Sequence, residues 1–124
     1  MNNKKKLVFL VDDNLLNLHA GKKILGEKYI VVAMPSAKNL FLALAKIKPA
    51  LILLDVDMPE MNGFEAIEIL KAKPETKDIP VIFITGRDGE NDKATGLALG
   101  AVEYIVKPYE PSLLLKTIET TLGA

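Results

Sequence analysis

Five short apolar runs alternate along the chain with five segments of helical periodicity, and this alternation constrains the fold more than any other feature. Alternating strands and helices favour a parallel sheet, because a parallel pair of strands needs a long crossover that a helix supplies. Right-handed crossovers place helices on both faces of the sheet. The sequence therefore predicts a three-layer α/β sandwich. Its expected strands are Leu7–Val11, Tyr29–Met34, Leu51–Leu54, Pro80–Ile84 and Val102–Val106.

The helical segments between these runs carry start and stop signals. Ser36 is a good N-cap, Pro49 and Pro74 stop the helices before them, and Pro111 suits the first turn of the last helix. Gly96 inside the fourth helix costs roughly 0.5–1 kcal/mol relative to alanine, so this helix should be the least firmly held. The expected helices are Asn14–Glu27 with Leu15 and Leu18 inward, Ser36 to about Lys48 with Ile47 at helical spacing, Phe64–Ala72, Asn91–Leu99 and a last helix opened by Pro111.

The apolar content of each run predicts its place in the sheet. The runs at 7–11, 51–54 and 80–84 are continuously apolar, which is typical of strands that are buried on both faces. The second run begins with Tyr29, and the fifth is broken by Glu103 and Tyr104, so these two should lie at the edges. This gives the order 2-1-3-4-5 of a five-stranded, flavodoxin-like (βα)5 fold.

The composition suits one domain that spans residues 1–124. Lys and Arg balance Asp and Glu at 16 each, so no global field favours nucleic acid or an anionic membrane as a partner. The Lys4–Lys6 run is expected to be a solvated tail. Without cysteine there is no disulfide and no thiolate ligand. No bilayer-spanning segment and no signal peptide before Leu7 can be identified, so we expect a cytoplasmic protein.

Polar side chains follow four of the five strands. Asp12 and Asp13 follow the first, Asp55 the third, Thr85 the fourth and Lys107 the fifth. Parallel strands end at the same edge, where open α/β sheets bind their ligands. Taken singly, Asp12 or Asp13 can cap a helix, Thr85 can be a turn residue and Lys107 a solvated charge. Together, three carboxylates in one crevice are unfavourable unless a cation is bound there.

The chemistry open to such a set is limited. Three oxygen ligands without His or Cys suit Mg²⁺, with Mn²⁺ as an alternative. A carboxylate can attack a phosphoryl group to form an acyl phosphate, and Lys107 and Thr85 can neutralise and hold the transferred oxygens. The chain has no Gly-rich phosphate loop, so a nucleotide is not the evident phosphoryl donor.

The chain resembles the receiver domains of two-component response regulators (the CheY-like family) over nearly its whole length. The matching stretches are Val11–Asn14, Leu54–Gly63, Ile84–Gly86 and Tyr104–Tyr109. The resemblance implies that Asp55 accepts a phosphoryl group from a phosphohistidine of a sensor histidine kinase or a phosphotransfer protein, and that the domain is not an enzyme in the usual sense.

The resemblance also implies the roles of the neighbouring residues. Asp12, Asp13, Asp55 and the backbone carbonyl of Asp57 would hold Mg²⁺, and Thr85 and Lys107 would bind the phosphoryl oxygens. Thr85 would move inward and Tyr104 would follow it. This movement would alter the face made by the fourth helix, the fifth strand and the fifth helix, which would signal to an unknown downstream effector. The Lys107–Pro108 bond is usually cis in this family. The fourth helix and the fifth strand could support a homodimer, and the sequence does not decide whether one forms.

Two other functions fit parts of this pattern. Asp55-Val56-Asp57, Thr85 and Lys107 also resemble the motifs of haloacid-dehalogenase-type phosphatases. However, the acidic metal-binding pair of those enzymes follows the lysine, and here Asp12 and Asp13 come first. A pseudo-receiver that binds a partner without phosphorylation is opposed by the intact acidic set.

A last expectation concerns Asp57, two residues after Asp55, and Arg87, two residues after Thr85. Neighbouring strands lie about 4.8 Å apart, so the two side chains should rise from adjacent loops over the mouth of the crevice. The planar guanidinium can grip a carboxylate with two hydrogen bonds. The pair is therefore predicted to form a partial lid, with independent, solvated side chains as the alternative.

Overall fold

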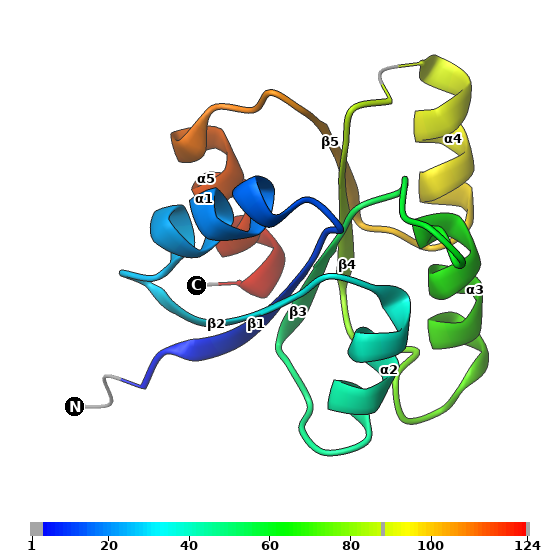
Figure 1. Ribbon diagram of the computed structural model, residues 1–124, viewed down its shortest axis with the longest axis horizontal. Coiled ribbons are helices and arrows are strands. Elements are labelled where there is room, and N and C mark those ends of the chain that lie inside the picture. The colour runs from blue at the N-terminus through cyan, green and yellow to red at the C-terminus, as the bar shows by residue number, and fades with distance from the viewer. Residues whose placement is uncertain (1–3, 88, 124) are drawn as a thin grey trace.

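The fold is a five-stranded parallel sheet between two layers of helices, as Figure 1 shows for the computed structural model, which describes residues 4–87 and 89–123. The strand order β2-β1-β3-β4-β5 confirms the predicted flavodoxin-like topology. The elements are β1 (Lys6–Val11), α1 (Leu15–Leu25), β2 (Tyr29–Met34), α2 (Ala37–Leu44), β3 (Leu51–Leu54), α3 (Gly63–Ala72), β4 (Val81–Thr85), α4 (Glu90–Ala98), β5 (Glu103–Val106) and α5 (Pro111–Leu122).

The sheet separates two apolar clusters. Helices α1 and α5 cover one face, and α2, α3 and α4 cover the other (Figure 1). Successive residues of a strand point to opposite faces. Accordingly, Ile52 and Phe83 belong to the cluster under α2 and α3, whereas Leu53 and Ile82 belong to the cluster under α1 and α5. The central strands are thus fixed from both sides, and their carboxyl ends form a rigid platform.

Side-chain caps set the starts of three helices. Asn14, Ser36 and Asn62 each accept a hydrogen bond from a backbone N–H of the first turn of α1, α2 and α3. At α3 the Glu65 side chain also accepts from the Asn62 N–H, which completes a capping box. Pro111 occupies the first turn of α5. The predicted roles of Ser36 and Pro111 are confirmed.

Some predicted boundaries and facings are wrong. Helix α2 ends at Leu44 and not near Lys48, because the N–H groups of Lys46 and Ile47 both bond to the Ala43 carbonyl and close the helix in a turn. Leu15 is 74% exposed, since it is the first residue of α1 and its side chain precedes the stripe that contacts the sheet. The remaining element ends lie within one or two residues of the predicted ones.

Gly96 has a packing role that sequence reasoning missed. A Cβ atom at this position would lie 3.0 Å from a ring carbon of Phe83 and 3.0 Å from one of Tyr104. Gly96 is also the buried residue of α4, which has no side-chain bond at its N-cap. The glycine lets α4 approach the sheet, so its cost in helix propensity is offset by close contact. Among the described residues, no helix is long and apolar enough to cross a membrane.

Candidate functional site

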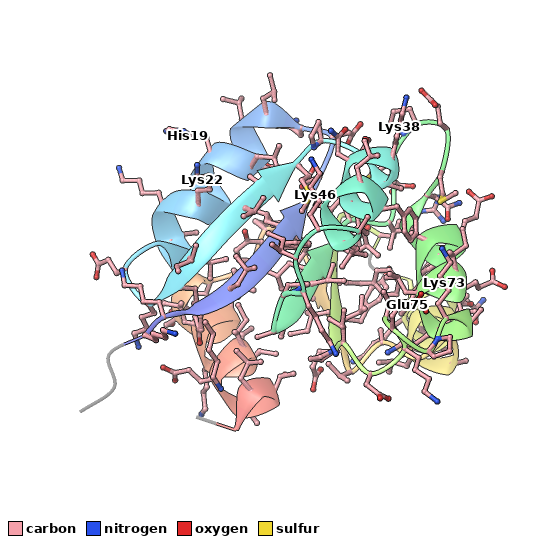
Figure 2. All side chains as sticks on the ribbon, turned by 90° about the horizontal axis from the view of Figure 1, so that it is seen from below. His19, Lys22, Lys38, Lys46, Lys73 and Glu75 are labelled. Atoms are coloured by element: carbon pink, nitrogen blue, oxygen red, sulfur yellow. The ribbon has the colours of Figure 1, made fainter. Side chains whose placement is uncertain are left out.

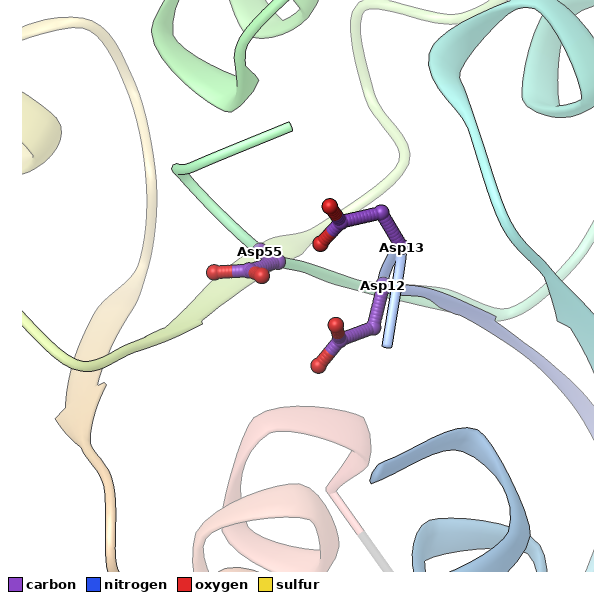
Figure 3. Close-up of side chains that lie close together, drawn as sticks. All are labelled: Asp12, Asp13 and Asp55. Atoms are coloured by element: carbon purple, nitrogen blue, oxygen red, sulfur yellow. The ribbon is translucent and has the colours of Figure 1, made fainter. Parts of the chain in front are cut away.

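Three carboxylates meet at the carboxyl ends of two adjacent strands. Asp12 and Asp13 follow β1 and Asp55 follows β3, and the register pairs Val11 with Leu54. One oxygen from each carboxylate lies within 4.8 Å of the other two. Figure 3 shows the three side chains around a common space. Asp12 and Asp55 are buried and Asp13 is exposed, so the crevice opens on the side of Asp13.

Asp12 is held in a defined orientation. Its Oδ1 accepts a hydrogen bond from the Asn14 N–H at 2.9 Å, and its own N–H donates to the Met34 carbonyl at 3.0 Å. The N-cap of α1 is Asn14, which accepts from the Asn17 N–H. The simpler interpretation, that Asp12 or Asp13 serves as this cap, is therefore wrong.

Lys107 supplies the positive charge that the carboxylates lack. Its Nζ lies 2.6 Å from Oδ2 of Asp12 and 3.6 Å from Oδ2 of Asp55. The end of β5 is fixed by the Lys107 N–H, which donates to the Thr85 carbonyl at 2.7 Å, and the next peptide bond, Lys107–Pro108, is cis. Burial alone would lower the pKa of Lys107, but the bonds and charges of Asp12 and Asp55 outweigh it and raise that pKa.

The surroundings of the Asp55 carboxyl group disfavour its charged form. Burial first, and then the negative charge of Asp12, raise the pKa of Asp55 to about 6, while Lys107 acts in the opposite direction. One lysine therefore does not neutralise the site. The oxygen ligands and the excess negative charge suit a hard divalent cation, and Mg²⁺ or Mn²⁺ fits this donor set.

The loop after Asp55 is folded closely around it. The Gly63 N–H donates to the Val56 carbonyl at 2.8 Å, and a Cβ atom on Gly63 would overlap the carbonyl oxygen of Asp55. Glu60 has a φ of 70°, in the left-handed region, and the Met61 N–H donates to the Pro59 carbonyl at 2.8 Å. Only a glycine at position 63 permits the start of α3 to lie this close to the backbone of Asp55.

Thr85 is the last residue of β4 and is fully buried, so it is not a simple turn residue. Its Oγ1 accepts a hydrogen bond from the Arg87 N–H at 3.2 Å. The Tyr104 hydroxyl donates to the Arg87 carbonyl at 2.8 Å, and the Tyr104 ring lies edge-on to Phe83 and is buried. The backbone of Arg87 thus joins the hydroxyl at the site to the aromatic ring on β5.

The side chain of Arg87 spans two further elements. Its Nε and Nη2 lie 2.8 and 2.7 Å from Oδ1 of Asp57, and its Nη1 lies 3.5 Å from Oδ1 of Asp92. Sequence reasoning anticipated the contact with Asp57 and missed the one with Asp92. The available signal was an acidic residue in the first turn of α4, five positions after Arg87.

Comparison with known proteins places this geometry in a family. Residues 8–119 match the response regulator receiver domain. The chain is 39% identical over 115 residues, 93% of its length, to a protein of Vibrio cholerae named as a probable cyclic di-GMP phosphodiesterase, and 45% identical over 76 residues, 61% of its length, to PilH of Pseudomonas aeruginosa. It spans 26% of the first protein and 63% of the second.

A solved structure agrees with these matches. The chemotaxis protein CheY4 of Vibrio cholerae superposes with a TM-score of 0.88 at 28% identity, over 94% of this chain and 98% of that one. Strand order, helix placement and the family match all concur, and the chain belongs to the response regulator receiver domains of two-component signalling systems, the CheY-like family.

Proposed function

We propose that Asp55 accepts a phosphoryl group from a phosphohistidine on a sensor histidine kinase or a histidine phosphotransfer protein. A carboxylate oxygen of Asp55 attacks phosphorus, the phosphorus–nitrogen bond breaks, and the histidine nitrogen keeps the bonding electron pair. Lys107 and the Thr85 hydroxyl hold the transferred oxygens. The observation that carries this proposal is the position of Asp55, a buried carboxylate at a rigid strand end with Nζ of Lys107 at 3.6 Å.

The test is phosphorylation by acetyl phosphate in the presence of Mg²⁺, followed by intact mass spectrometry. Asp55→Asn keeps the shape of the side chain and removes the nucleophile, so this variant should gain no phosphoryl group. Asp78→Asn is the matched control, because Asp78 is an exposed carboxylate in the loop before β4, at the opposite edge of the sheet. Wild-type phosphorylation of Asp55→Asn would refute the assignment.

A turnover assay with a different substrate separates a receiver from a phosphatase of the haloacid-dehalogenase type. A receiver phosphorylates and dephosphorylates itself, and it should not turn over an unactivated phosphomonoester. Steady release of phosphate from such a substrate, lost in Asp55→Asn, would favour the phosphatase.

We assign the metal to Asp12, Asp13, Asp55 and the backbone carbonyl of Asp57, with Mg²⁺ as the resident ion and Mn²⁺ as a substitute. The cation supplies charge neutralisation of the carboxylates and of the phosphoryl oxygens. Because it binds only the folded arrangement, Mg²⁺ should raise the melting temperature. Asp13→Asn should reduce that increase, and an unchanged increase would remove Asp13 from the ligand set.

The output is a shift of the surface made by α4, β5 and α5, with Thr85 and Tyr104 as the switch. A move of Thr85 toward Asp55 would pull on the Arg87 N–H and therefore on the carbonyl that holds Tyr104, at 3.2 and 2.8 Å respectively. We expect this surface to bind a downstream effector in the cytoplasm, without direct contact to nucleic acid or membrane. The same surface can also form a homodimer through α4 and β5.

NMR chemical shifts recorded with and without beryllium fluoride, a phosphoryl mimic, test the switch. Changes should concentrate between Gly86 and Tyr109. Changes confined to α1 and α2 would contradict the proposed switch. Phosphorylation of Asp55 by acetyl phosphate, measured on a separate sample without beryllium fluoride, would show whether the acceptor assignment still stands.

A further inference from the structure

Strand β2 forms an edge of the sheet that has no protecting residue between Lys28, which precedes it, and Pro35, which follows it. Its six residues, Tyr29–Met34, include no charge, no proline and no glycine. Exposed edges normally bear lysine, proline or a bulge, because an unpaired strand is a template for another strand. The opposite edge, β5, begins with the exposed Glu103. The two edges of this sheet are therefore not equivalent.

The backbone of β2 offers free hydrogen-bonding groups. The Asp12 N–H donates to the Met34 carbonyl at 3.0 Å, which fixes the direction of Met34 toward β1. Because the N–H and C=O of one strand residue point the same way and alternate along the strand, those of Val31 and Ala33 point outward. Within residues 4–87 and 89–123, these outward groups have no hydrogen-bond partner. Both residues are partly exposed, so this edge is accessible.

The flanks of this edge are positive and apolar. Helices α1 and α2 both pack against β2, and Figure 2 shows Lys22 on α1 and Lys38 and Lys46 at α2 on this side of the molecule. Ile30 on β2 and Leu42 on α2 are 54% and 59% exposed. Residues 14–48 contain one acidic residue, Glu27, and six lysines, of which Lys28 is paired with Glu119 at 3.0 Å. The other five are Lys22, Lys23, Lys38, Lys46 and Lys48.

We propose that the β2 edge is a docking site for an extended, acidic peptide segment of a partner protein, which adds to the sheet as a sixth strand. Val31 and Ala33 supply the main-chain hydrogen bonds, as in other strand additions, and Ile30 packs against alternate apolar side chains of the peptide. The lysines on α1 and α2 attract its carboxylates. A second copy of this chain is the less suitable occupant, because pairing β2 with β2 would bring the same lysines face to face.

A fluorescent peptide of about ten residues, with valine alternating with glutamate, is a suitable probe, since strands are usually three to ten residues long. Binding measured by anisotropy should weaken at least about ten-fold between roughly 0.05 M and 0.5 M NaCl. Amide hydrogen exchange at Val31 and Ala33 should slow when the peptide binds. A peptide with lysine in place of glutamate is the charge control.

Two changes test for strand addition itself. N-methylation of alternate peptide nitrogens removes donors from one edge only, and methylation of the edge that faces β2 should abolish binding whereas the other pattern should not. Ala33→Pro deletes an outward N–H at an edge strand, where proline is tolerated, and should weaken binding at least about ten-fold. Thermal unfolding checks that this variant is folded. If it is not, binding of the two methylated peptides to the wild-type protein still tests whether the peptide pairs with β2.

Three results would overturn the inference. Equal binding of both methylated peptides would show that contact is not through the strand edge. Equal binding of the lysine peptide would show that acidity is not recognised. A dimer of the free protein, by light scattering, that Ala33→Pro dissociates would show that a second copy occupies the edge.

Discussion

Lys107, which contacts Asp12 and Asp55, and Arg87, which contacts Asp57, hold their partners in different ways. The Lys107 side chain is 20% exposed and contacts Asp12, which is 1% exposed. The Arg87 side chain is 43% exposed and contacts Asp57, which is 55% exposed. Buried ion pairs are costly to break because a charge is left without a partner, whereas exposed pairs contribute little to stability. One side of the crevice is therefore fixed by charge, and the other is free to rearrange at low cost.

The largest expected effect comes from breaking the Lys107 side. Lys107→Met leaves Asp12 and Asp55 without a cation and should lower the free energy of unfolding by about 2–3 kcal/mol in metal-free buffer, a cost limited by protonation of Asp55. Urea denaturation measures it. Lys28→Met is the matched control, because Lys28 makes a similarly short but exposed bond to Glu119, at 3.0 Å. Equal stabilities of the two variants would contradict the difference between buried and exposed pairs.

The next effect is a dependence of stability on pH. In the unfolded chain the Asp55 carboxyl loses its proton above about pH 4, whereas in the folded protein it has a pKa of about 6. The folded state therefore binds the extra proton, and stability should fall as the pH rises from about 4 to about 6. Asp55→Asn should lack this decrease. Parallel stability curves for wild type and Asp55→Asn, without metal, would show that Asp55 is not perturbed.

A smaller effect is expected where α4 meets the sheet on the Arg87 side. Gly96→Ala places a methyl group 3.0 Å from ring carbons of Phe83 and Tyr104. Overpacking of this kind typically costs about 1–3 kcal/mol, and the better helix propensity of alanine returns up to about 1 kcal/mol. Chemical denaturation should therefore show a net loss of about 1 kcal/mol, with Tyr104 more exposed to solvent. A more stable variant would mean that α4 moves away freely.

The smallest expected effect belongs to the proposed lid of Asp57 and Arg87, and it is an effect on the rate of dephosphorylation. Asp57→Ala and Arg87→Ala should each speed hydrolysis of the acyl phosphate, because water reaches the phosphorus more easily. Exposed pairs are worth about 0–1 kcal/mol, so the increase should be at most about five-fold. If the residues act as one lid, the double variant is no faster than either single variant. Additive rates would exclude a shared lid, and slower hydrolysis in Asp57→Ala would indicate that Asp57 orients the water.

The sequence predicted best what the backbone dictates. Strand order follows from apolar content, and a parallel sheet then places Asp12, Asp55 and Lys107 at one edge without any knowledge of side-chain conformation. The contacts of Arg87 with Asp92 and Tyr104 could not be predicted in this way, because they depend on rotamers and on the path of a loop. The early end of α2 was missed for a different reason, because Pro49 sets only the limit before which that helix must stop.

The separation of the core into two clusters also bears on how such a domain can be re-engineered. Neighbouring residues of β5 point to opposite faces, so that Tyr104 belongs to one cluster and Ile105 to the other. A displacement of β5 consequently moves side chains in both helix layers, although no side chain belongs to both apolar clusters. Residues of one layer can then be exchanged to suit a new partner while the other layer keeps its own, which makes the two faces separately adjustable.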